Sequence, residues 1–197
     1  MREITQTIYT INELSDDAKA VAHQNWLDIN SEFNDLGFAT DDIIELGNCI
    51  GINIDKVLYT GFCSQGDGLC FTGDYEYKPT WNANLEGYAP RAEQLFELGQ
   101  ALEKVYKEHG AFSVDVSHIG GNYYHENSVD IDYVDADLAE QLGYDVLREV
   151  SVILRQFMQY SYRLLEAEQE YQSSLEYFME SSLGNEYEYY QNGRQYF

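Results

Sequence analysis

The sequence has few basic residues for its length. Only 11 of its 197 residues are Lys or Arg, against 35 Asp or Glu, which gives a formal net charge of −24 and a pI near 4.2. Affinity for nucleic acid depends on clustered Lys and Arg that replace the counterions of the phosphates. We therefore expect no direct binding to DNA or RNA, and a partner attracted by charge should present a basic protein surface. Solubility alone is the alternative explanation of the acidity.

Cysteines and long apolar runs are also scarce. The three cysteines, Cys49, Cys63 and Cys70, are odd in number and lack a metal-binding spacing, which indicates a reducing compartment and small buried side chains. No apolar run approaches the ~20 residues of a membrane span, and no signal-peptide core follows Met1. We expect a cytosolic protein with no membrane partner.

The most informative stretch runs from Val57 to Tyr77. Two runs of β-branched and aromatic residues flank a polar turn, Ser64-Gln65-Gly66-Asp67-Gly68, which predicts a β-hairpin. The two glycines allow positive φ on either side of the aspartate. Ser64, Gln65 and Asp67 are therefore candidate ligand-binding residues, and a tight turn whose aspartate bonds its own backbone is the alternative. No helix and no Lys-Ser/Thr pair follow, so the turn is not a phosphate loop.

The string G-F-C-S-Q-G-D-G-L-C-F-T-G within this hairpin resembles the G-F-x-S-Q-G-D-G-x-x-F-x-G signature of a family of phage, prophage and plasmid proteins, sometimes labelled antitoxin-like. Cys63 stands where that family usually has an aromatic residue, and Gln169 interrupts a stretch that is usually more acidic. The resemblance implies a mobile-element origin and no particular activity. It continues through four further segments: Glu13–Lys19, Tyr123–Glu126, Arg163–Tyr171 and Asn185–Arg194.

Hydrophobic periodicity predicts an α+β fold in a single domain, residues 1–197. We expect an antiparallel sheet of four to five strands, with amphipathic helices packed on one face and a long C-terminal helix. The expected strands are 3–11, 57–62, 69–77, 112–118 and 126–133, with a C-terminal ribbon that turns at Asn192-Gly193. The expected helices are 15–33, 41–49, 90–109, 135–172 and a short helix that ends at Gly184.

Several side chains have predicted positions within these elements. On the first helix, Val21, Ile29 and Phe33 should lie on the buried face. Ser15 and Thr40 should act as N-caps, and residues 81–87 should form a loop. The strand 112–118 should bury its even-numbered positions, ending at His118, and the returning strand should expose Glu126, Ser128, Asp130 and Asp132.

His118, His125 and Glu126 flank one turn and could bind zinc if Asp67 supplied a further ligand. Their spacing matches no structural zinc pattern, so a buried, hydrogen-bonded His118 is the favoured alternative. His125 with Glu126 or Asp67 could also act in acid–base catalysis. Neighbours in one strand point to opposite faces, however, and no catalytic signature is present. We expect no enzymatic activity, no metal and no cofactor.

The leading interpretation is an acidic binding surface. Asp115, Glu126, Asp130 and Asp132 should share the outer face of the second hairpin, with Tyr123 and Tyr124 offering contact area. Such an array could mimic nucleic-acid phosphates and occupy the basic channel of a host restriction or CRISPR-type protein. Two alternatives remain: an antitoxin-like partner of one toxin, and a small enzyme or ligand-binding protein with a pocket near Asp67, His118 and His125. The sequence also leaves open whether the protein forms a homodimer.

Overall fold

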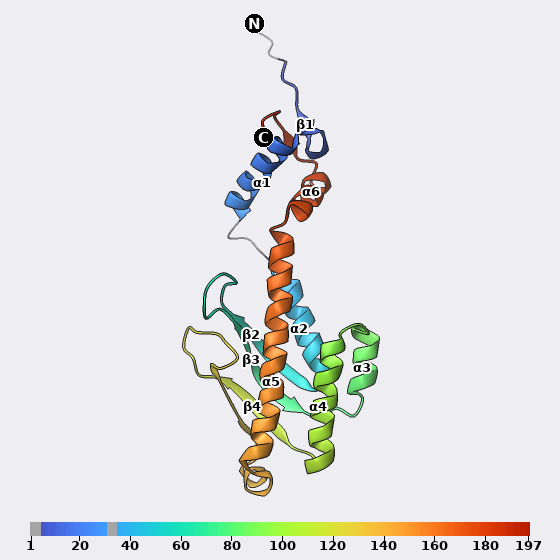
Figure 1. The fold of residues 1–197 in the computed structure, drawn as a ribbon, viewed down its shortest axis with the longest axis vertical. Coiled ribbons are helices and arrows are strands. Elements are labelled where there is room, and N and C mark those ends of the chain that lie inside the picture. Colours follow the sequence, from blue (N-terminus) through green and yellow to red (C-terminus); the bar gives the residue numbers. More distant parts are fainter. Residues whose placement is uncertain (1–4, 31–34) are drawn as a thin grey trace. The chain divides into compact units, whose positions relative to one another are not determined.

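The computed structural model describes residues 5–30 and 35–197, and these divide into two compact units. The larger unit comprises residues 37–166, and the smaller combines the described residues up to Leu36 with residues 167–197 (Figure 1). The expectation of a single domain stays a prediction. The α+β fold class is confirmed, because helices accompany an antiparallel four-stranded sheet and a separate two-stranded one.

The larger unit is built on the four-stranded sheet. Every neighbouring pair is antiparallel, and the spatial order follows the chain: β2 (Ile52–Tyr59), β3 (Leu69–Glu76), β4 (Ser113–His118) and β5 (Val129–Tyr133). The predicted alternation is confirmed on β4, where Val114 and Val116 are buried while Asp115 between them is exposed. β4 therefore has one face in the core, and β5 shows the same alternation.

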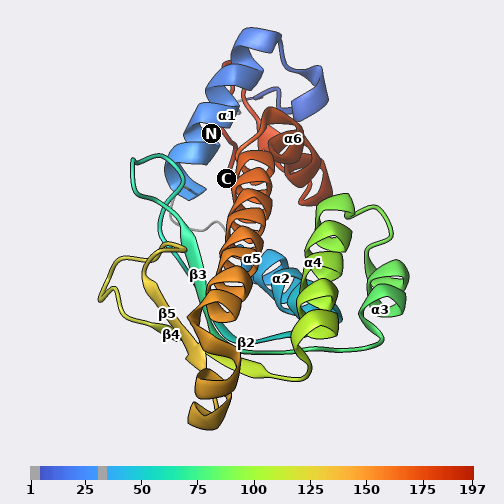
Figure 2. The ribbon, with the colours of Figure 1, turned by 60° about the horizontal axis from the view of Figure 1, so that its bottom comes forward.

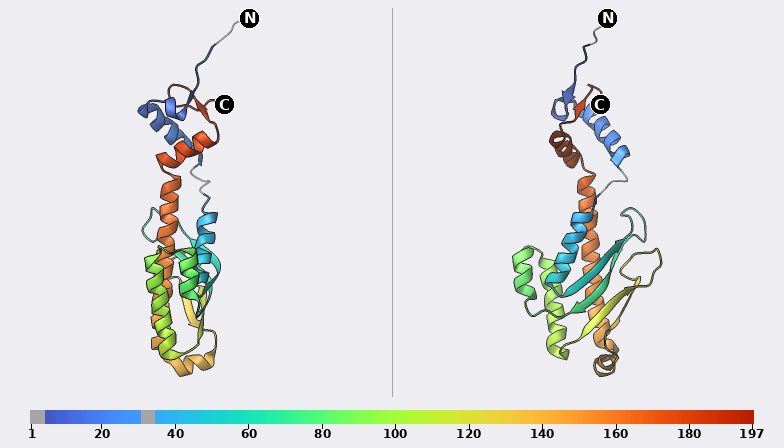
Figure 3. Two further views of the ribbon diagram at one scale, coloured as in Figure 1. Left: turned by 90° about the vertical axis from the view of Figure 1, so that its right-hand side faces the viewer. Right: turned by 180° about the vertical axis from the view of Figure 1, so that it is seen from behind.

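Helices cover one face of this sheet. Figures 2 and 3 show them against the same side, and no helix formed by the described residues of this unit covers the other side. Phe157 of the longest helix meets Phe71 of β3 edge to face, with ring centroids 6.0 Å apart. The four helices are α2 (Gly37–Cys49), α3 (Trp81–Tyr88), α4 (Glu93–His109) and α5 (Ala136–Gln172).

The positions of two helices differ from the prediction. Residues 81–88 form α3 instead of a loop, because Trp81 and Leu85, four residues apart, are both buried on one side of a short helix. Gly99 of α4 makes room for Trp81, since a Cβ there would lie 2.4 Å from the indole ring. Thr40 is not an N-cap: α2 begins at Gly37, and the Thr40 hydroxyl donates to the Gly37 carbonyl.

The long helix α5 confirms the predicted C-terminal helix but is interrupted. Gly143 has φ 76° and ψ 177°. This conformation lies outside the helical region and favours glycine, so α5 consists of two helical segments. Periodicity predicts an apolar stripe that includes Val150, Phe157, Leu164 and Tyr171. Val150 and Phe157 are buried as predicted, but Leu165 is buried instead of Leu164, and Tyr171 is exposed. Residues up to Glu166 belong to the larger unit and the remainder to the smaller.

The smaller unit joins the two ends of the chain. Its core consists of Ile11, Leu14, Ala18, Ala22, Phe178 and Tyr189. Its elements are β1 (Tyr9–Thr10), the 3₁₀ helix η1 (Ile11–Glu13), α1 (Asp16–Asn30), α6 (Leu175–Gly184) and β6 (Glu188–Tyr189). The two short strands pair antiparallel, Tyr9 opposite Tyr189. The long strand predicted over 3–11 is therefore wrong in its described part, and residues 3 and 4 lie outside the described residues.

Other predictions for this unit have mixed outcomes. Ser15 and Ser174 both accept a backbone N–H at the start of their helices, as capping residues do. The C-terminal turn is confirmed, because Tyr190 N–H donates to the Arg194 carbonyl at 2.8 Å and Gly193 has a φ of 83°. Val21 and Ile29 are exposed rather than buried, and Phe33 lies outside the described residues.

Candidate functional site

The polar turn between β2 and β3, residues 64–68, is held by its own aspartate. The Asp67 Oδ2 atom accepts hydrogen bonds from the backbone N–H of Cys63 at 2.9 Å and of Ser64 at 2.7 Å. The Asp67 N–H in turn donates to the Ser64 carbonyl. This is the turn chemistry given above as the alternative to ligand binding. Ser64 and Gln65 are exposed, and Cys63, predicted to be buried, is exposed as well.

The two glycines of this turn accommodate a second loop, residues 119–128, between β4 and β5. A Cβ on Gly68 would lie 2.7 Å from Cδ2 and 3.2 Å from Cα of His125, so only glycine leaves room for that residue. Gly66 has a φ of 102°, and a Cβ there would touch the Tyr123 ring at 3.5 Å. The Tyr123 and His125 rings stack on each other with centroids 5.8 Å apart. The first loop thus forms a surface on which the second loop packs.

His125 and Glu126 form a close pair. The distance from Nδ1 of His125 to Oε2 of Glu126 is 2.9 Å. The prediction that they point to opposite faces is wrong, because β5 begins only at Val129 and the preceding residues turn. In that turn the Ser128 N–H donates to the His125 carbonyl, and the Ser128 side chain, predicted to be exposed, is buried. The strand alternation therefore does not reach this pair.

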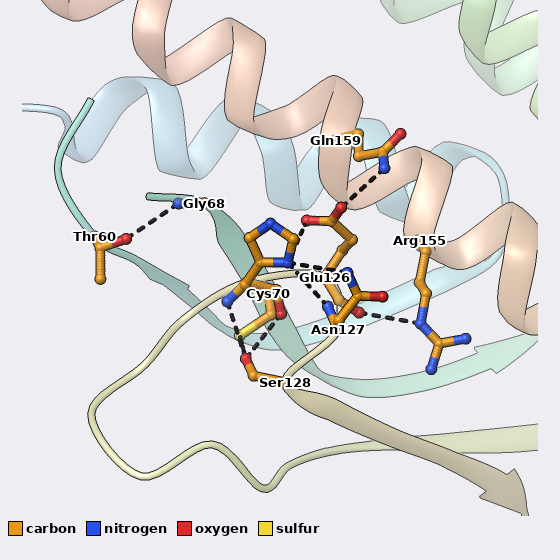
Figure 4. Close-up of polar contacts among 9 residues, drawn as sticks. Thr60, Gly68, Cys70, Glu126, Asn127, Ser128, Arg155 and Gln159 are labelled. Atoms are coloured by element: carbon orange, nitrogen blue, oxygen red, sulfur yellow. Dashed lines mark hydrogen bonds and ion pairs between the residues drawn. The ribbon is translucent and has the colours of Figure 1, made fainter. Parts of the chain in front are cut away.

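The Glu126 side chain points towards α5 (Figure 4). Its Oε1 atom accepts a hydrogen bond from Nε2 of Gln159 at 2.9 Å, and its backbone carbonyl accepts one from Nε of Arg155 at 3.1 Å. The predicted place of Glu126 on the outer acidic face is therefore wrong. Both of its carboxylate oxygens are engaged, and the side chain is 15% exposed. The glutamate fastens the second loop to the long helix.

The contacts of the His125 ring identify its free nitrogen. Nδ1 lies 2.9 Å from a Glu126 carboxylate oxygen, and the backbone N–H of Asn127 also points at Nδ1 from a longer distance, 3.3 Å. We assign the proton to Nδ1 because the shorter contact is to an oxygen that only accepts. Nε2 then carries the lone pair, and no described residue donates to it. A carboxylate-held imidazole with a free Nε2 can accept a proton or a hydrogen bond from a ligand.

His118 lies apart from this pair. Its Nε2 is 2.9 Å from the Tyr123 carbonyl, and its ring is 5.1 Å from that of Tyr124. The hydrogen bond was expected, but the ring is half-buried at the end of β4 rather than buried in the core. Within residues 5–30 and 35–197, no group of three or more His, Cys, Asp or Glu side chains is placed to hold a metal ion. The two histidines do not converge on a common ligand position.

Two side chains near the loops are poor nucleophiles. Burial raises the pKa of the Cys70 thiol, an effect that hydrogen bonds from the Ser128 side chain and the His125 backbone partly oppose. Burial likewise raises the pKa of the Tyr162 hydroxyl, and the carboxylates of Glu166 and Asp67 raise it further. The Tyr162 hydroxyl donates to the Gly61 carbonyl at 3.1 Å. Neither group favours covalent catalysis.

A row of aspartates crosses the helix-free face of the sheet. Asp74 of β3 stands opposite Asp115 of β4, which stands opposite Asp132 of β5, and we call these three residues the aspartate row. Asp130 lies two residues before Asp132, opposite Ser117. Asp115, Asp130 and Asp132 are exposed, as predicted, and Asp74 is half-buried. Sequence reasoning missed Asp74, because the alternation predicts its face but not which residues stand opposite it.

No ion pair neutralises the aspartate row within the described parts of the chain. Asp74 accepts a hydrogen bond from the Asn53 side chain at 2.7 Å, and Asp132 accepts one from the Tyr133 backbone. Of the nearby lysines, Lys78 donates to the Asn48 carbonyl and the Asn53 side chain. Lys56 of β2 stands opposite Thr72, on the same face as Asp74, but it forms no ion pair with a described carboxylate. Carboxylates directly opposite each other repel, so the row lowers the stability of the isolated sheet.

Comparison with known proteins gives one match. A family model described as a domain of unknown function (DUF8835) matches residues 36–174. The chain belongs to the DUF8835 family. The DUF8835 match contains the four-stranded sheet, both loops and the aspartate row, whereas most of the smaller unit lies outside it. Neither the curated proteins nor the solved structures contain a match to the chain.

One further property of the DUF8835 chain concerns membranes. Within the described ranges, none of its helices combines the length and the apolar character that crossing a bilayer requires.

Proposed function

We propose that this protein is carried by a phage or another mobile element and acts in the host cytoplasm by binding. Its target is a basic surface of a host defence protein that handles DNA or RNA, such as a restriction or CRISPR-type effector. The protein occupies the channel for the nucleic-acid backbone and performs no chemistry there. The observation that carries the proposal is the aspartate row, with three carboxylates side by side and no basic side chain pairing with them among the described residues.

The spacing of these carboxylates suits a regular cationic channel. Neighbouring strands lie about 4.8 Å apart and alternate residues on one strand about 6.7 Å apart. The aspartate row and Asp130 therefore form a small lattice of negative charge on a hydrogen-bonded sheet. Because the sheet fixes the backbone, little conformational freedom is lost when a partner binds. Basic side chains on the partner would also remove the repulsion between the aspartates.

The resemblance of the Gly61–Gly73 string to phage and plasmid proteins supports the mobile-element origin. Mobile elements meet host nucleases that bind nucleic acid through basic grooves, and a protein with a net charge of −24 is attracted to such grooves at long range. The same charge opposes direct binding to nucleic acid. Attraction to basic grooves and weak binding to nucleic acid are both expected of a protein that competes with nucleic acid for such grooves.

A competition assay tests the proposal. A fluorescent duplex of about 20 base pairs is bound to each of a panel of purified restriction and CRISPR-type proteins, and the protein is titrated in. We expect displacement by the wild type from at least one panel member. The row variant D74N/D115N/D132N should displace it about tenfold more weakly or worse, because each charge pair that is lost weakens the complex.

The matched control removes the same number of charges elsewhere. In E97Q/E140Q/E149Q the three substituted glutamates are exposed on α4 and α5. This control should displace the duplex nearly as well as the wild type. Equal losses in the two triple variants would mean that net charge matters and the row does not. Displacement that is insensitive to salt between about 50 and 500 mM would contradict the electrostatic basis of the proposal.

A further inference from the structure

A cavity lies between the two loops and α5 in the larger unit. Its volume is about 260 Å³. A water molecule occupies about 30 Å³ of the liquid, so the cavity has room for a ligand of roughly eight or nine waters, below the usual size of drug-binding pockets. The lining residues come from three elements: Asp67 and Gly68 from the first loop, His125 and Glu126 from the second, and Gln159, Tyr162 and Arg163 from α5.

Charges of both signs line this cavity without neutralising each other. Asp67 spends Oδ2 on its own turn, and its other oxygen has no partner among the described residues. Arg163 donates from Nη2 to Oε1 of Gln94 at 2.9 Å, and it forms no ion pair with any described carboxylate. The cavity therefore has an anionic wall on the first loop and a cationic wall on α5, and each retains unused hydrogen-bonding capacity.

The third unused polar atom is Nε2 of His125. The Glu126 carboxylate holds the Nδ1 side of the ring, and Gly68 and Tyr123 fix the plane of the ring. An imidazole held in this way presents a lone pair at a fixed position. Glu126 itself is not available to a ligand, because its two oxygens bind His125 and Gln159.

The complementarity of these groups selects the ligand class. A simple anion would bind Arg163 but would lie beside two carboxylates, and a simple cation would lie beside the guanidinium. A molecule with both charges satisfies both walls at once. We infer that the cavity binds a small zwitterion of the amino-acid type, with its carboxylate on Arg163 and its ammonium group donating to Oδ1 of Asp67 and Nε2 of His125. This site is separate from the aspartate row and does not depend on the proposed function.

Isothermal titration calorimetry on the full chain tests the inference. The probes are glycine and L-serine, with acetate and ethylammonium as molecules that carry only one of the two charges. We expect both amino acids to bind, and each single-charge probe to bind about tenfold more weakly or worse, since it loses one charge-assisted contact. Arg163→Gln should weaken amino-acid binding by a similar factor.

The matched control is Arg148→Gln, which removes the same charge from an exposed position on the same helix. This variant should bind like the wild type, and circular dichroism should show both variants folded. Three results would overturn the inference: no heat with either amino acid at concentrations up to about 50 mM, acetate binding as tightly as glycine, or equal effects of the two arginine substitutions.

Discussion

The aspartate row makes a quantitative prediction about stability: Asp115→Asn should stabilise the larger unit. Asp115 stands between Asp74 and Asp132, one on each neighbouring strand. With side chains about 5 Å apart, Coulomb's law in water gives about 0.8 kcal/mol of repulsion per neighbour, hence about 1.7 kcal/mol for two. Screening reduces this to about 1.4 kcal/mol at 0.01 M salt and about 0.3 kcal/mol at 1 M.

The assay is urea unfolding at these two salt concentrations, followed by tryptophan fluorescence. Trp26 belongs to the smaller unit and Trp81 to the larger, so a Trp26→Phe background makes the signal report on the sheet and its helices. Asp132→Asn should stabilise by a similar amount, because Asp132 faces Asp115 across the strands and lies about 6.7 Å from Asp130 along its own strand. Asp55→Asn is the control, since Asp55 lies at the bulge of β2 with no residue opposite it.

The salt dependence decides whether this reasoning holds. If Asp115→Asn fails to stabilise at low salt, or stabilises equally at both concentrations, the carboxylates do not repel as their register implies. If Asp55→Asn stabilises as much as Asp115→Asn, the effect belongs to the total charge of the protein. Either result would also remove the physical basis for a rigid acidic lattice.

Three further predictions concern single side chains. Gly68→Ala should lower the free energy of unfolding by about 1–3 kcal/mol, because the new Cβ would clash with His125 of the second loop. In the same assay Gly87→Ala should raise the free energy of unfolding by about 0.5–1 kcal/mol, because Gly87 lies in α3 and a Cβ there meets nothing within 4 Å. Tyr75→Phe should raise it by about 1 kcal/mol, since the buried Tyr75 hydroxyl has no partner among the described residues, and a lower value would contradict this. A hydrogen bond to Asp42 raises the pKa of Tyr88 to about 12. The contribution of this bond to stability is therefore complete below pH 10 and is lost as the pH rises through 12. A difference titration against Tyr88→Phe should show a phenol that ionises near pH 12, and a phenol that ionises near pH 10 would refute this prediction.

The core of the larger unit was predictable where the period of the side chains was clear. The alternation in residues 112–118 placed Val114 and Val116 in the core, because successive side chains in a strand point to opposite faces. The helix α3 was missed because its eight residues include Asn82, Asn84 and Gly87, which are weak helix formers. Its stability comes from the packing of Trp81 on α4, which is a tertiary effect.

The candidate site depended on information that periodicity does not carry. Strand alternation predicts that His125 and Glu126 point to opposite faces, but the segment that contains them is a turn, in which the two side chains meet. The aspartate row required the cross-strand register, which sequence patterns do not specify residue by residue. The packing of Gly68 against His125 joins positions 57 residues apart in the chain, and the G-D-G motif alone does not identify that neighbour.

The pairing of β1 with β6 has a consequence for how this protein is made. Ile11 and Leu14 precede the four-stranded sheet in the sequence, and Phe178 and Tyr189 follow it, yet all four share one core. During translation Ile11 and Leu14 must therefore stay uncovered until the chain up to Tyr189 has emerged from the ribosome. The sheet and both loops lie between these two ends, so they have all their own strands available earlier during translation.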